Sequence, residues 1–266
     1  MRIRRLLCIG LLAIGISSPP AGLAQATGDE SRLLLGISVG AVGGKRLWSA
    51  GPQAVQFLGT ADTLALSRRI RSNLVIGFGG SYFSSENLGL AVEGFLVGLG
   101  FEDSCRQVFS SGSGSIAATC QSIQGRETPA SAVVLSAGPV LRFNSRKLFS
   151  PYARANLGFV FSTQSAIRTS GVFPTPAGPS TLVVYDDDRN SRVDPSLALG
   201  VGFTAAVAKS YHLRWEIRDN IVGVQQVTGT TPIAGLLPPH KRVFKHLFSM
   251  TVGFDVILER RKGRRY

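Results

Sequence analysis

Hydrophobic and polar residues alternate along several segments of the chain. The clearest segment, Tyr211–Asn220, has apolar side chains at odd positions up to Ile217 and polar ones at even positions from His212 onward. Successive side chains of a strand point to opposite faces, so this alternation predicts a strand with one apolar and one polar face. Eight strands are predicted in this way: Leu33–Ala41, Phe57–Arg69, Asn73–Phe83, Ala132–Phe143, Pro151–Phe161, Ser196–Ala208, Tyr211–Asn220 and Phe244–Leu258.

The links between these segments alternate in length. Short links at about residues 69–72, 144–149 and 209–210 alternate with long ones at about 45–56, 84–130, 164–194 and 223–243. Outer-membrane barrels have short periplasmic turns and longer outer loops, and an even number of strands. The sequence therefore predicts an all-β fold, an eight-stranded antiparallel transmembrane β-barrel over residues 27–258 with long outer loops.

Two other all-β folds also alternate, namely a soluble β-sandwich and a soluble lipocalin-like barrel. Their polar face meets water and carries many charged side chains, whereas here it holds Gly, Ser, Ala and a few charges, as the narrow lumen of a small barrel requires. One further apolar segment, Leu88–Phe101, fits no predicted strand of the eight. It extends an outer hairpin, or it pairs with Ser115–Ser122 and makes ten strands.

The first 26 residues have the layout of a secretory signal peptide. A basic start with Arg2, Arg4 and Arg5 precedes an apolar run, Leu6–Ile16, and then small residues up to Ala26. The run is too short for a membrane helix, which needs about 20 apolar residues. We expect residues 1–26 to be removed on export, and no transmembrane helix in the mature chain.

Export also bears on the cysteines, because Cys8 leaves with the signal peptide. Cys105 and Cys120 remain, 15 positions apart within the predicted 84–130 loop. In an exported chain, such a pair predicts a disulfide. A metal site is the alternative, but zinc needs three or four ligands and the histidines lie far away in the sequence.

The composition fits a membrane barrel better than a nucleic-acid-binding protein. Only 17% of the residues are charged, against about 25% in soluble domains, and 31 are glycine. Much of the net charge of +13 lies in the signal peptide and in the basic tail 259–266. That tail either contacts anionic headgroups or is a disordered solubilising tail. No basic stripe remains, so we expect no nucleic-acid partner.

These features together resemble the small OmpA/OmpX-like outer-membrane β-barrel proteins. The last strand, Thr251–Leu258, is similar to the assembly signal of that family, although Val256 and Leu258 are aliphatic where aromatic residues are usual. The resemblance implies a monomer in the bacterial outer membrane, in contact with outer-membrane lipid and lipopolysaccharide. It also implies the barrel assembly machinery as a partner, and an unknown external ligand for the outer loops.

Several charged residues have the parity of the lumen. Two interpretations stay open for them: a selectivity lining for a pore, or a network of ion pairs that closes the lumen. Side chains can fill the lumen of an eight-stranded barrel, which favours the closed form. The predicted lumen network is Arg142, Arg154, Arg214, Glu216, Arg218 and Asp255.

One acidic segment partly matches a calcium-binding loop. Ser191 stands where that loop needs glycine and Leu197 where it needs the closing Glu, so a solvated acidic loop is the alternative. The weak calcium candidates are Asp186, Asp188, Asn190 and Asp194.

Few residues could support catalysis. Acyl chemistry on lipids needs a nucleophile beside a base, and the available residues are His212, His240, His246 and Ser249. On strand parity, His246 faces lipid while Ser249 faces the lumen, so the two diverge. We expect no enzyme activity and no cofactor. The predicted function is that of a structural or surface-interaction protein, with a narrow solute pore and a lipid-modifying enzyme as alternatives.

Overall fold

The computed structural model describes residues 30–57, 60–110, 112, 114–162, 167–187, 193–227 and 239–261. The predicted signal peptide, 1–26, and the last five residues of the basic tail lie outside the described residues. None of the helices in the described part of the chain is long and apolar enough to cross a membrane.

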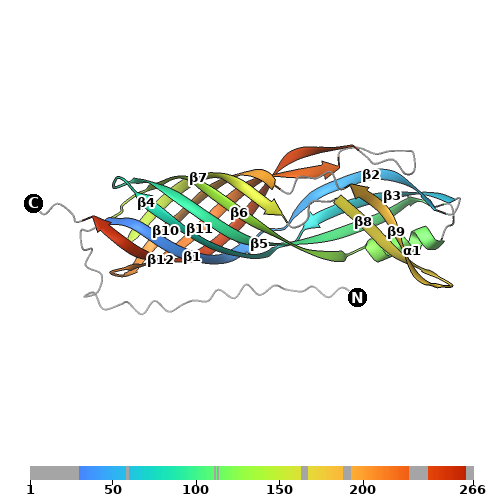
Figure 1. Ribbon diagram of the computed structural model, residues 1–266, viewed down its shortest axis with the longest axis horizontal. Coiled ribbons are helices and arrows are strands. Elements are labelled where there is room, and N and C mark those ends of the chain that lie inside the picture. Colours follow the sequence, from blue (N-terminus) through green and yellow to red (C-terminus); the bar gives the residue numbers. More distant parts are fainter. Residues whose placement is uncertain are drawn as a thin grey trace, which may run out of the picture.

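Eight antiparallel strands close into a ring, which we call the barrel (Figure 1). Around the ring the order is β5, β4, β1, β12, β11, β10, β7 and β6, and β6 pairs again with β5. Closure leaves the ring without a free edge. The predicted all-β fold and the eight-stranded antiparallel barrel are confirmed. The ring strands are β1 (Glu30–Val42), β4 (Asn73–Phe83), β5 (Leu88–Phe109), β6 (Arg126–Arg142), β7 (Phe149–Ser162), β10 (Val193–Ala208), β11 (Tyr211–Val227) and β12 (His240–Arg261).

The outer surface of the barrel is apolar. Its side chains are large and exposed, with Leu157 at 70% and Ile37 at 66% relative exposure. A soluble protein does not expose such a continuous apolar surface, because its contact with water is unfavourable. We call this surface the apolar belt. Its members include Leu35, Ile37, Val39, Ile76, Phe78, Leu90, Val92, Leu135, Leu157, Phe159, Leu199, Val201, Ile217, Phe248, Met250 and Val252.

Short turns gather at one end of the barrel, which we call the turn end. They are residues 84–87, 143–148 and 209–210. The first described residue, Glu30, lies at the same end and pairs with Arg261 near the end of β12.

At the opposite end the chain builds a second region, which we call the extension (Figure 1). There β5 and β6 continue beyond the ring, and β3 pairs with the outer part of β5 from Ile70↔Phe101 onward. The extension consists of β2 (Lys45–Phe57), β3 (Thr60–Ile70), α1 (Gly114–Ile123), β8 (Ile167–Thr175), β9 (Gly178–Asp187) and the outer parts of β5 and β6.

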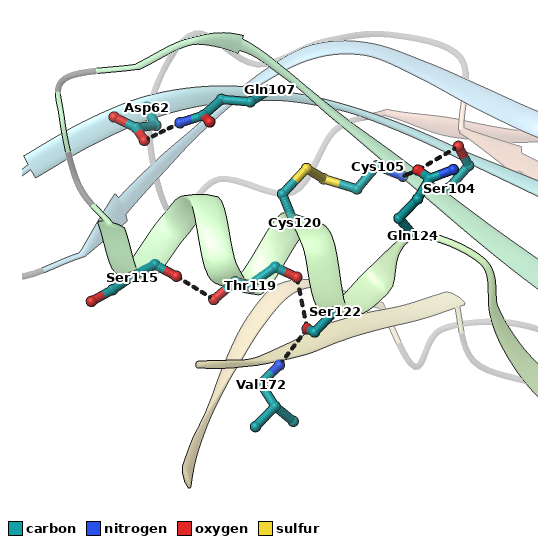
Figure 2. Close-up of a disulfide and its surroundings, with 10 residues drawn as sticks. All are labelled: Asp62, Ser104, Cys105, Gln107, Ser115, Thr119, Cys120, Ser122, Gln124 and Val172. Carbon is teal, nitrogen blue, oxygen red and sulfur yellow. Dashed lines mark hydrogen bonds between the residues drawn. A yellow bond between two sulfur atoms is a disulfide. The ribbon is translucent and has the colours of Figure 1, made fainter. Parts of the chain in front are cut away.

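A disulfide between Cys105 of β5 and Cys120 ties α1 to the sheet of the extension (Figure 2). The side chain of Gln124 accepts a hydrogen bond from the Cys105 backbone N–H at 3.1 Å. On its other side, α1 meets β8, where the Val172 N–H donates to the Ser122 hydroxyl at 2.7 Å. The helix is therefore held between β5 and the β8–β9 hairpin.

Two segments differ from the prediction. Phe57–Arg69 is not a ring strand, because β3 lies in the extension, and its place in the ring is taken by Leu88–Phe101 within β5. Residues 84–130 are consequently not one outer loop: 84–87 is a turn at the turn end, and the 69–72 link lies at the other end. The ten-strand alternative is wrong, because Ser115–Ser122 is helical.

The interior changes character along the long axis of the molecule. The core of the extension is apolar and includes Trp48, Leu64, Ile116 and Ile123, all at most 2% exposed. The barrel interior instead contains buried charges. On β5 alone, the inward positions are Gly89, Ala91 and Glu93 in the barrel and then Phe95, Val97, Leu99 and Phe101 towards the extension.

Candidate functional site: the charged lumen of the barrel

Three ring strands direct large polar side chains into the middle of the barrel. They are β5, β7 and β11, and we call their cluster the plug: Glu93, Tyr152, Arg154, Asn156, Glu216 and Arg218. Every member is less than 10% exposed. Each of these strands alternates in parity at this level, so these six polar side chains face the lumen while the residues next to them face outward.

Glycines on the neighbouring strands make room for these side chains. Gly200 of β10 is paired with Arg154 on one side and with Arg218 on the other. A Cβ at Gly200 would collide with the carboxylate of Glu216. Similarly, Gly79 of β4 is opposite Glu93. Large and small residues therefore alternate around the ring, which lets a narrow barrel hold four charged side chains at one level.

Glu216 is the central acceptor of the plug. Its carboxylate accepts hydrogen bonds from the Tyr152 hydroxyl at 2.8 Å, from Nε of Arg154 at 2.9 Å and from Nε of Arg218 at 2.8 Å. Charge-assisted bonds of this kind are stronger than neutral ones. The carboxylate oxygens of Glu216 thus have three donors from two strands.

Glu93 joins the same two arginines from the opposite wall. It forms an ion pair with Arg154, and Nη2 of Arg218 donates to its Oε2 at 2.6 Å. The amide of Asn156, which is fully buried, donates to the same oxygen at 2.8 Å. Two carboxylates therefore balance two guanidinium groups, and the net charge of the plug is zero. A buried charge is costly unless it is paired, so the four groups depend on one another.

The structure places three predicted lumen residues in the plug and three nearer the turn end. Arg154, Glu216 and Arg218 belong to the plug. Arg214 and Asp255 form a separate cross-strand ion pair, with 3.6 Å between Nη2 and Oδ1. Arg142 is near the turn end, where it donates to the Ser31 hydroxyl at 2.7 Å and lies over the Phe83 ring, 3.6 Å from its centroid.

Sequence reasoning missed Glu93, Tyr152 and Asn156 as members of this site. Glu93 lies in the apolar segment that the prediction left outside the strands. Its parity was nevertheless readable, since Leu90 and Val92 are exposed while Ala91 and Glu93 are buried. Assigning that segment to the ring would have placed an acid opposite the predicted arginines.

Of the four calcium candidates, only Asp194 has its side chain among the described residues. Asp188 and Asn190 lie outside them, as does the side chain of Asp186. The carboxylate of Asp194 is engaged elsewhere, in an ion pair with Arg242 at 3.1 Å. Among the described side chains, no cluster of three His, Cys, Asp or Glu residues could hold a metal ion.

The candidate catalytic residues point in different directions. His246 is exposed on the outer face, where its Nδ1 lies 2.7 Å from Oδ2 of Asp219. Ser249 is buried and accepts a hydrogen bond from Asn220 at 2.9 Å. His212 is paired with Asp255 in the β11–β12 register, and the side chain of His240 is outside the described residues. A nucleophile and its base must be within hydrogen-bond reach, and these described residues do not provide such a pair.

No family model matches this chain, and no curated protein matches it. Several solved structures are similar to it, including the following three. Neisserial surface protein A (NspA) shares 12% identity, with 86% of this chain and 99% of that chain covered and a TM-score of 0.43. OprG from Pseudomonas aeruginosa shares 10% identity, with 86% of this chain and 97% of that chain covered and a TM-score of 0.48. Ail from Yersinia pestis shares 13% identity, with 85% of this chain and 98% of that chain covered and a TM-score of 0.36.

Two features identify the architecture as a membrane-spanning barrel: the ring is closed, and its outer surface is the apolar belt. Lipid offers no hydrogen bonds to the backbone, so strands cross a bilayer only as a closed barrel with an apolar exterior. The fold is that of a small outer-membrane β-barrel. The ring therefore spans a lipid bilayer, with the belt against lipid and the plug across the lumen.

Proposed function

We propose that this protein is a closed outer-membrane barrel of the structural and surface-interaction type, which does not conduct ions. The plug carries this proposal. Its four charged side chains are all paired with one another and fill the lumen between β5, β7 and β11. An ion that entered would have to displace these bonds and leave buried charges without partners, which is costly.

The proposed orientation puts the turn end in the periplasm and the extension outside the cell. Short turns are the periplasmic feature of such barrels, and longer loops are the outer feature. In this orientation, the interaction surface of the protein is the extension, with lipopolysaccharide around its base. We also propose that the protein is a monomer and that the barrel assembly machinery recognises β12.

A narrow solute pore is the second candidate, because charged side chains line the lumen. Single-channel recording in a planar bilayer distinguishes the two functions. For the wild-type protein we expect no stable conductance steps. We expect steps for the double variant Arg154→Ser, Arg218→Ser, since it shortens the two side chains that cross the lumen. Stable wild-type steps whose ion selectivity changes in Arg218→Ser would establish the pore instead.

Two controls keep that experiment interpretable. Arg69→Ser removes an arginine whose exposed side chain pairs with Glu102 in the extension, so it should leave the recordings unchanged. Heat-modifiable gel migration reports whether each variant has a closed, detergent-resistant barrel. A lipid profile of a deletion strain tests the remaining alternative: a change in acyl chains would favour a lipid-modifying enzyme.

A further inference from the structure

A cavity of about 140 Å³ lies between the plug and the core of the extension. Most of its wall is apolar and comes from both regions of the molecule. The wall includes Trp48 of β2, Val75 of β4, Phe95 and Phe101 of β5, Ala132 of β6 and Val160 of β7. Because these side chains come from five strands, the cavity depends on the tertiary fold and is not a local defect in one hairpin.

The two arginines that reach this cavity are already engaged by carboxylates. Arg68 donates to Asp103 through Nε at 2.6 Å and through Nη2 at 2.9 Å. Arg218 belongs to the plug, and its guanidinium lies 4.5 Å from the centroid of the Phe95 ring. A charged ligand would have to compete with these buried ion pairs. The cavity therefore favours an uncharged occupant.

One donor in the wall lacks an acceptor. Trp48 is 2% exposed, and its indole Nε1 has no hydrogen-bond partner among the described residues. The guanidinium of Arg68 lies 5.8 Å from the centroid of the Trp48 ring, and that group is itself a donor. Buried indole N–H groups usually find an acceptor, so an occupant that brings one would satisfy this site.

We propose that this cavity binds one uncharged molecule about the size of a benzene ring, which accepts a hydrogen bond from the Trp48 indole. The size follows from a known case: an apolar cavity of about 150 Å³ in another protein stays dry and binds benzene. The ring of the occupant contacts the apolar wall, and its acceptor engages Nε1 of Trp48. This binding function is separate from the closed state of the lumen, because the plug forms the boundary of the cavity.

Three probes of similar size test each part of the proposal in lipid nanodiscs. Benzonitrile has a ring and a nitrile acceptor, phenylacetylene has the same shape without the nitrile nitrogen, and benzoate is charged. The indole N–H signals in ¹⁵N-resolved NMR give the readout, since the chain has two tryptophans. Trp215 serves as an internal reference, because it stacks on exposed Phe203 at the outer face of the barrel and senses probe dissolved in lipid.

We expect benzonitrile to shift the Trp48 signal to a saturable endpoint while the Trp215 signal stays nearly fixed. Phenylacetylene should bind about three- to tenfold more weakly, as expected for loss of one hydrogen bond. Benzoate should not bind. Parallel, unsaturable shifts of both indole signals would overturn the proposal, as would benzoate binding as tightly as benzonitrile.

Two variants and one control locate the site. Ala132→Phe places a ring in the cavity and should weaken benzonitrile binding by about tenfold or more, because no volume remains for the probe. Trp48→Phe keeps an aromatic wall but removes the donor, so benzonitrile and phenylacetylene should then bind equally. Because this variant lacks the Trp48 indole signal, binding is measured from the backbone amide signals of residues that line the cavity. Ala155→Phe makes the same change on the lipid side of β7 and should bind like wild type. Undiminished binding to folded Ala132→Phe protein would contradict the proposed site.

Discussion

The barrel and the extension have opposite arrangements of polarity. In the barrel, apolar side chains such as Val92 point outward and charges such as Glu93 point inward. Farther along the same strand, apolar Phe101 points inward, while Glu102 forms an outward ion pair with Arg69. The single strand β5 therefore has one arrangement of polarity in the barrel and the opposite arrangement in the extension. The solvent outside each region decides which parity is apolar: lipid surrounds the barrel and water surrounds the extension.

The largest expected effect comes from charging the lipid side of the barrel. The double variant Leu199→Arg, Val201→Arg places two arginines in the apolar belt and should destabilise the barrel by about 4–8 kcal/mol, since each arginine costs about 2–4 kcal/mol near the bilayer midplane. Urea unfolding in lipid vesicles measures the free energy. Val108→Arg is the matched control in the extension, where the exposed position faces water and the cost should stay within about 0.5 kcal/mol. Equal costs at the two sites would contradict the difference between the regions.

The next largest effect concerns the buried charges of the barrel. Glu216→Ala leaves Arg154 and Arg218 without one of their two carboxylates and should cost about 3–5 kcal/mol in the same unfolding assay. A loss below about 1 kcal/mol would mean that water already solvates the lumen. Glu259→Ala is the control, because its pair with Arg32 is about half-exposed on both sides.

Removing the disulfide should affect the extension and spare the barrel. The Cys105–Cys120 bond closes a loop of 15 residues, so the double variant Cys105→Ala, Cys120→Ala should destabilise the extension by about 3 kcal/mol. Hydrogen exchange should rise in α1 and in the β8–β9 hairpin. Exchange in β12 and heat-modifiable migration should not change. Loss of the barrel along with α1 would show that the two regions fold as one unit.

The smallest expected effect is on the charged outer face of the extension. Arg69→Ala removes a surface ion pair with Glu102, where Nη2 and Oε2 are 2.7 Å apart. Exposed pairs contribute about 0–1 kcal/mol, and salt screens them. Thermal unfolding at low and high salt checks this. A decrease in the free energy of unfolding above about 2 kcal/mol would indicate that the pair is shielded from water. The ion pairs of the extension and those of the plug would then not differ in their exposure to solvent.

The sequence predicted seven of the eight ring strands correctly, because lipid and lumen impose different side chains on alternate positions. The exception, Leu88–Phe101, lacks alternation from Phe95 onward, since its outward positions meet lipid and its inward positions join the apolar core of the extension. Phe57–Arg69 was assigned to the ring because Leu64 and Leu66 do alternate. Alternation reports a strand with two different faces, but it does not report whether lipid or water covers one of them.

The candidate site could be predicted only as far as its strands were. Arg154, Glu216 and Arg218 lie on segments with clear parity, and all three belong to the plug. Glu93 was not predicted because its segment, Leu88–Phe101, was not assigned to the ring. Asn156 and Tyr152 were not predicted because only charged residues were considered for the lumen network. The cavity beyond the plug could not be predicted at all, because it arises where side chains of ten strands meet in space.

The length of β5 determines how far the extension projects above the membrane surface. At about 3.3 Å per residue, its 22 residues span roughly 70 Å along the strand. With a strand tilt of about 40° and an apolar band about 25 Å tall, the tip of the strand stands roughly 30 Å above the lipid. In the proposed orientation, α1 and the end of β5 are then presented to large molecules such as antibodies. A serum raised against the folded extension should stain intact cells.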